Sequence, residues 1–143
     1  MKTKFSQILK LKKRRVEEIE NALTEVRAQK RRALREIEDI LQEIASLKTP
    51  TSGSFGEMNV AFMSLSQLSN QKKSKEFEVT QIEQRIRDIQ ELYKEANIEF
   101  EKIQYLEDEE HKKVLEALKV QENKDMDEIA NLLYSRFKNE VEA

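Results

Sequence analysis

The stretch Lys48-Thr-Pro-Thr-Ser-Gly-Ser-Phe-Gly-Glu57 holds the single proline and both glycines of the 143-residue chain. Pro50 has no backbone N–H to donate, and Gly53 and Gly56 permit positive φ, so a helix is expected to stop here. The rest of the sequence is dominated by residues that helices tolerate or favour. The chain is therefore predicted to turn once, at residues 49–57, between two helices.

Upstream of the turn, apolar residues recur at alternating steps of four and three. Eleven of the 13 positions are apolar, and Lys12 and Lys30 are the exceptions. A mean spacing of 3.5 residues, sustained over about six heptads, is typical of a coiled-coil seam. We interpret the two lysines as residues that reach solvent or set the register. The series is Phe5, Leu9, Lys12, Val16, Ile19, Leu23, Val26, Lys30, Ala33, Ile37, Ile40, Ile44 and Leu47.

Downstream of the turn, Ser54 and Glu57 have the spacing of a capping box if the second helix begins there. The same stepping then gives a second seam without an exception, at Val79, Ile82, Ile86, Ile89, Tyr93, Ala96, Phe100 and Ile103. This seam meets Glu107 and Glu110, which are charged. Apolar residues resume in a shifted frame at Val114, Leu118, Met126, Ile129, Leu133 and Phe137.

The charges favour pairing of the two helices with each other. Residues 1–48 carry 13 Lys or Arg against 8 Asp or Glu, and residues 49–143 carry 13 against 20. Antiparallel pairing brings these unlike charges together. The predicted fold is an all-α, two-helix antiparallel coiled-coil hairpin, a single domain over residues 1–143. Helix 1 is expected at about 3–48 and a longer helix 2 at about 58–141.

The second helix is expected to outlast the first. A turn centred near residue 52 sets Phe5 opposite about residue 100, which leaves an overhang of about 40 residues. An amphipathic overhang of this kind calls for a partner. Three arrangements of residues 105–143 remain open: an extended helix, a third helix that folds back at the acidic break, and self-association.

The sequence offers little chemistry for an enzyme. It has no GxxxxGK[ST], HExxH or GxSxG motif and no Cys, so phosphate-loop, zinc-peptidase, hydrolase and thiol chemistry lack their minimum parts. The lone His111 is interpreted as lying on a solvated helix face. No enzymatic activity, catalytic residue, metal site or cofactor is predicted. No apolar run approaches the roughly 20 residues of a membrane span, so direct membrane insertion is not expected.

Two basic clusters and one weakly charged stretch are candidate interaction surfaces. The clusters are Lys10–Arg15 and Lys30–Arg32 with Arg35. They fit a solvated helix face, an acidic protein surface or, with fewer supporting features, nucleic acid or a membrane surface. Within Phe55–Leu68, one interpretation is that four apolar residues simply close the hairpin tip, namely Val60, Ala61, Leu65 and Leu68. The other interpretation is that Phe62 and Met63 form an exposed patch for protein docking.

The chain resembles the FliJ family, the coiled-coil stalk proteins of the flagellar type III export ATPase. The resemblance rests on the opening KFSQILKLKK of Lys4–Lys13, the single turn near one third of the length, and ENKDMDEIA of Glu122–Ala130 followed by YSRF of Tyr134–Phe137. It implies a hairpin similar to the γ stalk of rotary ATPases. It also implies a cytoplasmic role in flagellum biogenesis, motility and protein export, peripherally associated with the inner membrane through the export apparatus.

The resemblance implies three partners: the flagellar export ATPase hexamer, the cytoplasmic part of the export-gate protein FlhA, and export chaperones. It implies no nucleic acid. For the gate, this chain lacks the family's aromatic residues at the end of helix 1 and has Ile40, Ile44 and Leu47 instead. The residues implied for the ATPase end are Ile8, Leu11, Lys12, Arg14, Arg15, Ile129, Leu133 and Phe137; those implied for the turn-proximal gate contact are Phe62, Leu65 and Leu68.

Other functions remain open at this point. A general coiled-coil chaperone would use its tip as prefoldin does, although the turn here has no room for a β-hairpin. A structural scaffold outside the flagellum would self-associate without a partner. A nucleic-acid binder would depend on Lys10–Arg15 and on salt. The type III secretion stalk proteins, a second coiled-coil family, would share the same pattern.

Overall fold

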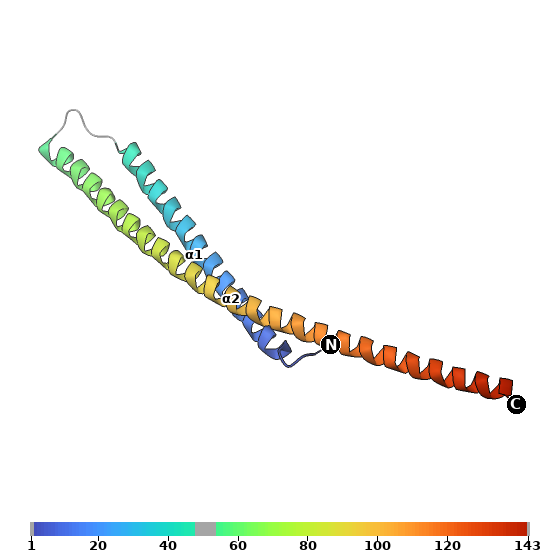
Figure 1. Cartoon of the computed structure of the whole chain (residues 1–143). Helices are drawn as coiled ribbons and strands as arrows, with labels where there is room; N and C mark the ends of the chain where they lie inside the picture. Colours follow the sequence, from blue (N-terminus) through green and yellow to red (C-terminus); the bar gives the residue numbers. More distant parts are fainter. Residues whose placement is uncertain (1, 48–53, 143) are drawn as a thin grey trace. The chain divides into compact units, whose positions relative to one another are not determined.

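The computed structural model describes residues 2–47 and 54–142, which form two helices and no strand (Figure 1). Helix α1 spans Ser6–Ser46 and helix α2 spans Phe55–Glu142. The predicted turn at 49–57 was too long at its C-terminal side, because Phe55, Gly56 and Glu57 are already helical. Residues 48–53 lie outside the described part of the chain.

A capping arrangement fixes the start of α1. The hydroxyl of Thr3 accepts the backbone N–H of Phe5 at 3.2 Å, and the hydroxyl of Ser6 accepts the backbone N–H of Thr3 at 2.8 Å. The two side chains therefore satisfy N–H groups that have no partner within the first turn of a helix. These bonds hold a turn at residues 3–6, from which the regular helix continues at Ser6.

Helix α2 starts early for a similar reason. The Ser54 hydroxyl accepts the backbone N–H of Glu57 at 3.2 Å, which is the N-cap bond expected from their spacing. Glu57 also places a negative charge in the first turn, where the helix dipole is positive. Gly56, which suggested a turn in the sequence, is accommodated inside the first helical turn with an ordinary negative φ.

The described chain divides into two units, and each is considered by itself. The central unit comprises residues 14–97, and the terminal unit comprises residues 1–13 together with 98–143. In the central unit, Ala33, Val79 and Ile82 form the most buried cluster, and three partly buried residues pack against it: Val26, Ile37 and Ile86. All six belong to the predicted seams, and Val16, Ile19 and Ala96 of the same seams are also buried.

Contacts across the central unit show that its helices are antiparallel. Glu36 pairs with Lys75, Lys30 pairs with Glu83 at 3.5 Å, and the Tyr93 hydroxyl donates to Glu20 at 3.3 Å. As the residue number falls along α1, it rises by a similar amount along α2. The hydrogen bond to Glu36 is the main cause that raises the pKa of Lys75, assisted by Glu78. Lys30, one of the two polar exceptions in the seam, thus reaches a carboxylate of α2.

The terminal unit is antiparallel in the same way. Lys12 Nζ lies 2.7 Å from Glu99 Oε2, and the Ser6 hydroxyl donates to Glu107 Oε1 at 3.4 Å. The expectation that Phe5 lies opposite about residue 100 was wrong, because its neighbour Ser6 meets Glu107. The pairs Lys12–Glu99 and Ser6–Glu107 are centred near residue 56 instead of residue 52, so the partner of each α1 residue lies about eight positions later in α2 than expected. The predicted all-α antiparallel hairpin with a longer second helix is confirmed.

Candidate partner-binding surfaces

The largest candidate surface is the C-terminal part of α2. Every residue from Leu115 to Val141 is exposed, and no described segment of the terminal unit covers them. Many of these residues are large and apolar, which is unusual for a helix surface in water. They are Leu115, Leu118, Val120, Met126, Ile129, Leu132, Leu133, Tyr134, Phe137 and Val141.

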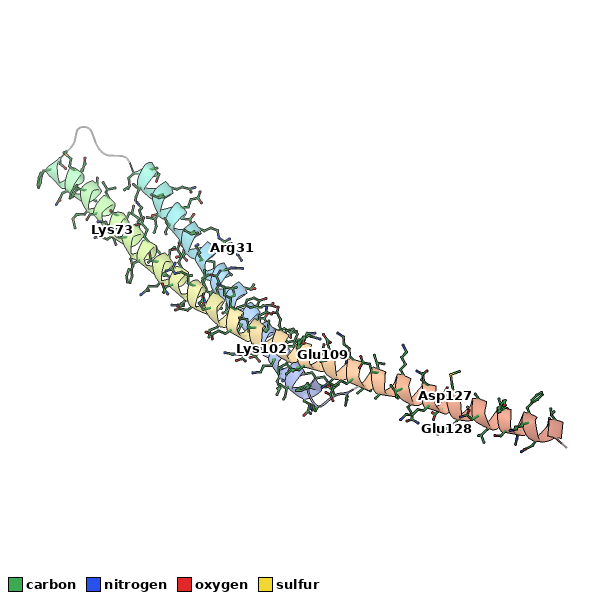
Figure 2. All side chains as sticks on the ribbon, viewed as in Figure 1. Arg31, Lys73, Lys102, Glu109, Asp127 and Glu128 are labelled. Atoms are coloured by element: carbon green, nitrogen blue, oxygen red, sulfur yellow. The ribbon has the colours of Figure 1, made fainter. Side chains whose placement is uncertain are left out.

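These apolar residues form a face rather than a random scatter. Met126, Ile129, Leu133 and Phe137 follow one another at steps of three and four residues, so they share one side of the helix. Asp127 and Glu128, labelled on this stretch in Figure 2, belong to the polar side. Ile129, Leu133 and Phe137 are 57%, 60% and 66% exposed. The acidic stretch before them does not interrupt α2, so no third helix begins there.

Ile8 and Leu11 lie in α1 of the terminal unit, next to the seam. Ile8 is 43% exposed and Leu11 is 63% exposed, whereas the seam residues Phe5 and Leu9 beside them are partly buried. Lys12 is partly buried and holds Glu99, so its charge is engaged within the unit.

Arg14 and Arg15 belong to the central unit, where both are exposed. Arg15 lies 3.9 Å from Glu18 on the same helix. Such a solvent-exposed contact holds the guanidinium weakly, which leaves it available to another carboxylate.

The seam of the terminal unit ends in a polar cluster. Glu107 is only 9% exposed, and its Oε2 has no hydrogen-bond partner among the described residues. Its Oε1 accepts from Ser6 and lies 3.7 Å from Nε2 of His111. His111 is therefore partly buried against a carboxylate rather than free on a solvated face. About two turns earlier on α2, the hydrogen bond from Lys12 lowers the pKa of Glu99.

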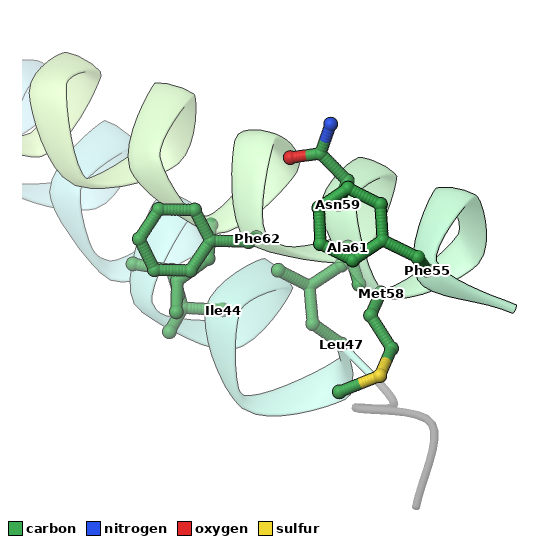
Figure 3. Close-up of a pocket in the computed structure, with 8 residues that line it drawn as sticks. Ile44, Leu47, Phe55, Met58, Asn59, Ala61 and Phe62 are labelled. Atoms are coloured by element: carbon green, nitrogen blue, oxygen red, sulfur yellow. The ribbon is translucent and has the colours of Figure 1, made fainter. Parts of the chain in front are cut away.

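A second surface lies at the turn-proximal end of the central unit. Ile44 and Leu47 of α1 and the first turns of α2 line a hollow of about 520 Å³. Figure 3 shows Phe62 beside Ile44, and Met58 and Phe55 beside Leu47. Among the described residues, α1 and α2 line the hollow with mostly apolar side chains, which suits an apolar side chain of a partner.

The three residues predicted for the gate contact differ from one another in exposure. Phe62 is 69% exposed and Leu65 is 42% exposed, and both line the hollow. Leu68 is partly buried. Phe55 and Met58, which also line the hollow, were not predicted as contact residues. The capping spacing of Ser54 and Glu57 was the sequence signal that could have identified them. A helix that starts at Phe55 puts residues 55, 58 and 62 on one side.

A candidate metal site is not found in the described ranges. No group of three or more His, Cys, Asp or Glu side chains among residues 2–47 and 54–142 is arranged to hold a metal ion. Neither helix, over the same residues, is long and apolar enough to cross a membrane. The candidate surfaces present apolar side chains beside charged ones, and such surfaces suit contacts with other proteins.

The fold and these surfaces define a coiled-coil hairpin protein. A family model described as the flagellar FliJ protein matches residues 1–139. The chain therefore belongs to the flagellar FliJ family, as the end sequences suggested. Its role lies in flagellar protein export, in association with the flagellar export apparatus, and the family is a non-enzymatic component of that system. The chain has no significant match among curated proteins or among solved structures.

Proposed function

We propose that this protein is a non-enzymatic adaptor that binds the flagellar export ATPase hexamer and stimulates it. The observation that carries the proposal is the exposed apolar face of α2 around Ile129, Leu133 and Phe137. Burying three such side chains in an interface supplies binding energy of roughly 1.5–3 kcal/mol each before the costs of association. Membership of the flagellar FliJ family supplies the export context.

The N-terminal part of α1 is proposed as a second contact with the ATPase, considered by itself. Ile8 and Leu11 offer two more exposed apolar side chains, and Arg14 and Arg15 offer exposed guanidinium groups. Arginine pairs with carboxylates in a bidentate geometry, so an acidic surface of the ATPase fits these residues. Lys12 is assigned a supporting role, because its ammonium group already holds Glu99.

The turn-proximal hollow is proposed as the contact with the cytoplasmic part of FlhA. Phe62 and Leu65 frame it from α2, and Ile44 and Leu47 frame it from α1. Aliphatic residues here provide the open half of a hydrophobic groove, which an aromatic or aliphatic side chain of the gate protein can fill. Leu68 would support Leu65 from the partly buried side. Export chaperones are proposed as further partners, with no site assigned.

The proposed location follows from these partners. A protein that binds the ATPase and the cytoplasmic part of the gate works in the cytoplasm, held at the inner membrane through the export apparatus. No ATP hydrolysis is expected from the chain alone. Hydrolysis that scaled with the concentration of highly purified chain would contradict the adaptor role.

The ATPase contact is tested by adding the purified chain to the flagellar ATPase of the same cell. We expect the hydrolysis rate to rise, and a triple variant Ile129→Ser, Leu133→Ser, Phe137→Ser to need about tenfold more protein for the same effect. The matched control replaces Lys124, Asn131 and Ser135 of the polar side with Ala. Equal activity of the two variants would reject this surface as the ATPase contact.

The gate contact needs a separate measurement. Binding of the chain to the isolated cytoplasmic part of FlhA is expected to weaken about tenfold in a Phe62→Ser, Leu65→Ser variant. Ser66→Ala and Gln67→Ala in the same turns serve as the control. ATPase stimulation is expected to be unchanged by both, so a common loss would point to misfolding instead of a gate contact.

A further inference from the structure

We propose that two copies of this chain associate, with the C-terminal part of α2 of one copy packed along a basic face of α1 of the other. The inference goes beyond the export function and does not depend on the ATPase or gate contacts. The basic face is defined by Arg27, Arg31, Leu34 and Leu41, and the acidic segment that covers it is defined as residues 122–137.

The basic face has cations that the hairpin itself does not neutralise. Five cations lie between Arg27 and Arg35 and no acidic residue separates them. Lys30 pairs with Glu83, but Arg27, Arg31 and Arg35 are exposed and make no ion pair with a described residue. The nearby acids of α2 are engaged elsewhere, since Glu76 pairs with Lys72 and Glu78 pairs with Lys75.

Two leucines give this face an apolar component. Leu34 is 46% exposed and Leu41 is 44% exposed, and they are separated by one heptad. Together with Arg27, Arg31 and Glu38 they continue steps of four and three along one side of α1. The stripe runs about 20 Å along the helix at 1.5 Å per residue. A second helix with matching periodicity is the partner that such a stripe fits.

The acidic segment has the complementary pattern. Glu122, Met126, Ile129 and Leu133 follow steps of four, three and four, as do Arg27, Arg31, Leu34 and Glu38. In a parallel alignment Arg27 lies beside Glu122 and Leu34 lies beside Ile129. Asp125 and Asp127 flank Met126, opposite Arg31. The alignment brings opposite charges together around Arg27 and Arg31, and it brings Leu34 against Ile129 one turn further along.

Other anionic partners fit the same face less well. Helix α1 has no aromatic residue on which bases could stack. The acids Glu36, Glu38 and Asp39 follow the arginines directly and would be repelled by an anionic membrane. An acidic helix with its own apolar stripe satisfies both parts of the face, and this chain carries such a helix uncovered.

The proposal predicts a consequence for the free protein. The apolar face of residues 122–137 would be covered by a second copy when no other partner is present, which limits nonspecific aggregation. The contacts of Arg27 and Arg31 with the acidic residues around Glu122 are electrostatic. The association is therefore expected to weaken as the salt concentration rises from about 0.05 M to about 0.5 M. It is also reversible, because neither helix has to unfold.

The test is a charge exchange followed by sedimentation of the full chain. Two double variants are made: Arg27→Glu with Arg31→Glu, and Glu122→Lys with Asp125→Lys. Each is expected to weaken self-association about tenfold or more. A mixture of the two is expected to associate, because both pairings between unlike copies have matched charges. The original acidic residues of the first variant meet the original arginines of the second, and the new lysines of the second meet the new glutamates of the first. The control Arg32→Glu, Lys73→Glu makes the same charge change on other faces and should associate like the original chain (Lys73 and Arg31 are labelled in Figure 2).

Cross-linking supplies the second measurement, since the chain has no natural cysteine. Copies with Leu34→Cys mixed with copies with Ile129→Cys are expected to form a disulfide-linked dimer faster than Leu34→Cys mixed with Lys124→Cys. A chain that stays monomeric to about 100 μM at low salt would overturn the proposal. Failure of the mixed charge variants to associate would also overturn it. So would a variant Arg27→Glu, Arg31→Glu that loses binding to vesicles or nucleic acid but self-associates like the original chain.

Discussion

Nζ of Lys12 lies 2.7 Å from Oε2 of Glu99, and these two residues are 87 positions apart in the chain. Lys12 interrupts the apolar series of α1, and the pair shows why the interruption is tolerated. The ammonium group reaches across to α2 and meets a carboxylate at the edge of the seam. A charged seam position thus becomes a contact that only one alignment of the two helices can make.

The first prediction concerns this pair and pH. The hydrogen bond from Lys12, followed by its charge, lowers the pKa of Glu99. A carboxyl whose folded pKa is lower than its unfolded value of about 4.3 contributes stability above that value. The contribution is lost as the pH falls through the folded pKa. In Lys12→Met, an NMR titration is expected to show the Glu99 pKa rising towards its ordinary range.

Lys94→Met is the control for this titration, because Lys94 pairs with Glu91 on the same helix and not with Glu99. The Glu99 pKa should be unchanged in that variant. An unchanged Glu99 pKa in Lys12→Met as well would show that the pair does not form in solution.

The second prediction concerns the core of the central unit. Ile82 is 3% exposed and packs in the cluster with Ala33 and Val79. Truncation of a buried Ile to Ala removes transfer energy and leaves a cavity, so Ile82→Ala is expected to lower the free energy of unfolding by about 2–4 kcal/mol. Urea denaturation measures it. Leu132→Ala, at a residue that is 67% exposed, should change stability by less than about 0.5 kcal/mol.

The third prediction concerns the buried carboxylate at the end of the terminal seam. Glu107 Oε2 has no hydrogen-bond partner among the described residues, and an unpaired buried polar atom of this kind costs about 1–3 kcal/mol. Glu107→Leu is therefore expected to stabilise the pairing of residues 6–13 with α2. Hydrogen exchange of the α1 amides in this segment should become slower.

A matched variant separates charge from shape at this position. Glu107→Gln keeps the size and the bond to Ser6 but removes the charge, so it should lie between the original chain and Glu107→Leu. Faster exchange in Glu107→Leu would mean that the contacts to Ser6 and His111 outweigh the cost of the buried oxygen.

The fourth prediction concerns the start of α2. The Ser54 hydroxyl holds the Glu57 N–H at 3.2 Å, and loss of an N-cap costs about 1 kcal/mol. Ser54→Ala is expected to speed hydrogen exchange at Glu57 and Met58 about fivefold. Ser54→Asp retains a capping oxygen and should exchange at nearly the original rate. Equal exchange in Ser54→Ala and the original chain would show that another group caps the helix.

The sequence by itself determined the class of fold. A period of 3.5 in the upstream series and again from Val79 to Ile103 allows only helices that pair along a seam. The seam positions from Phe5 to Ile44 are buried or partly buried, as their spacing requires, and only Leu47 at the end is exposed. The end sequences also indicated the flagellar FliJ family. The partner-contact residues remain predictions, because no partner is present to test them.

Only the tertiary structure decided which residues of the two helices meet. The sequence pattern is nearly the same at each heptad, so a slip of seven residues along α2 leaves the apolar seam almost equally satisfied. Specific polar pairs break this equivalence: Lys30 with Glu83 in the central unit, and Ser6 with Glu107 in the terminal unit. Such pairs depend on side chains brought together from distant positions, which no local spacing can reveal.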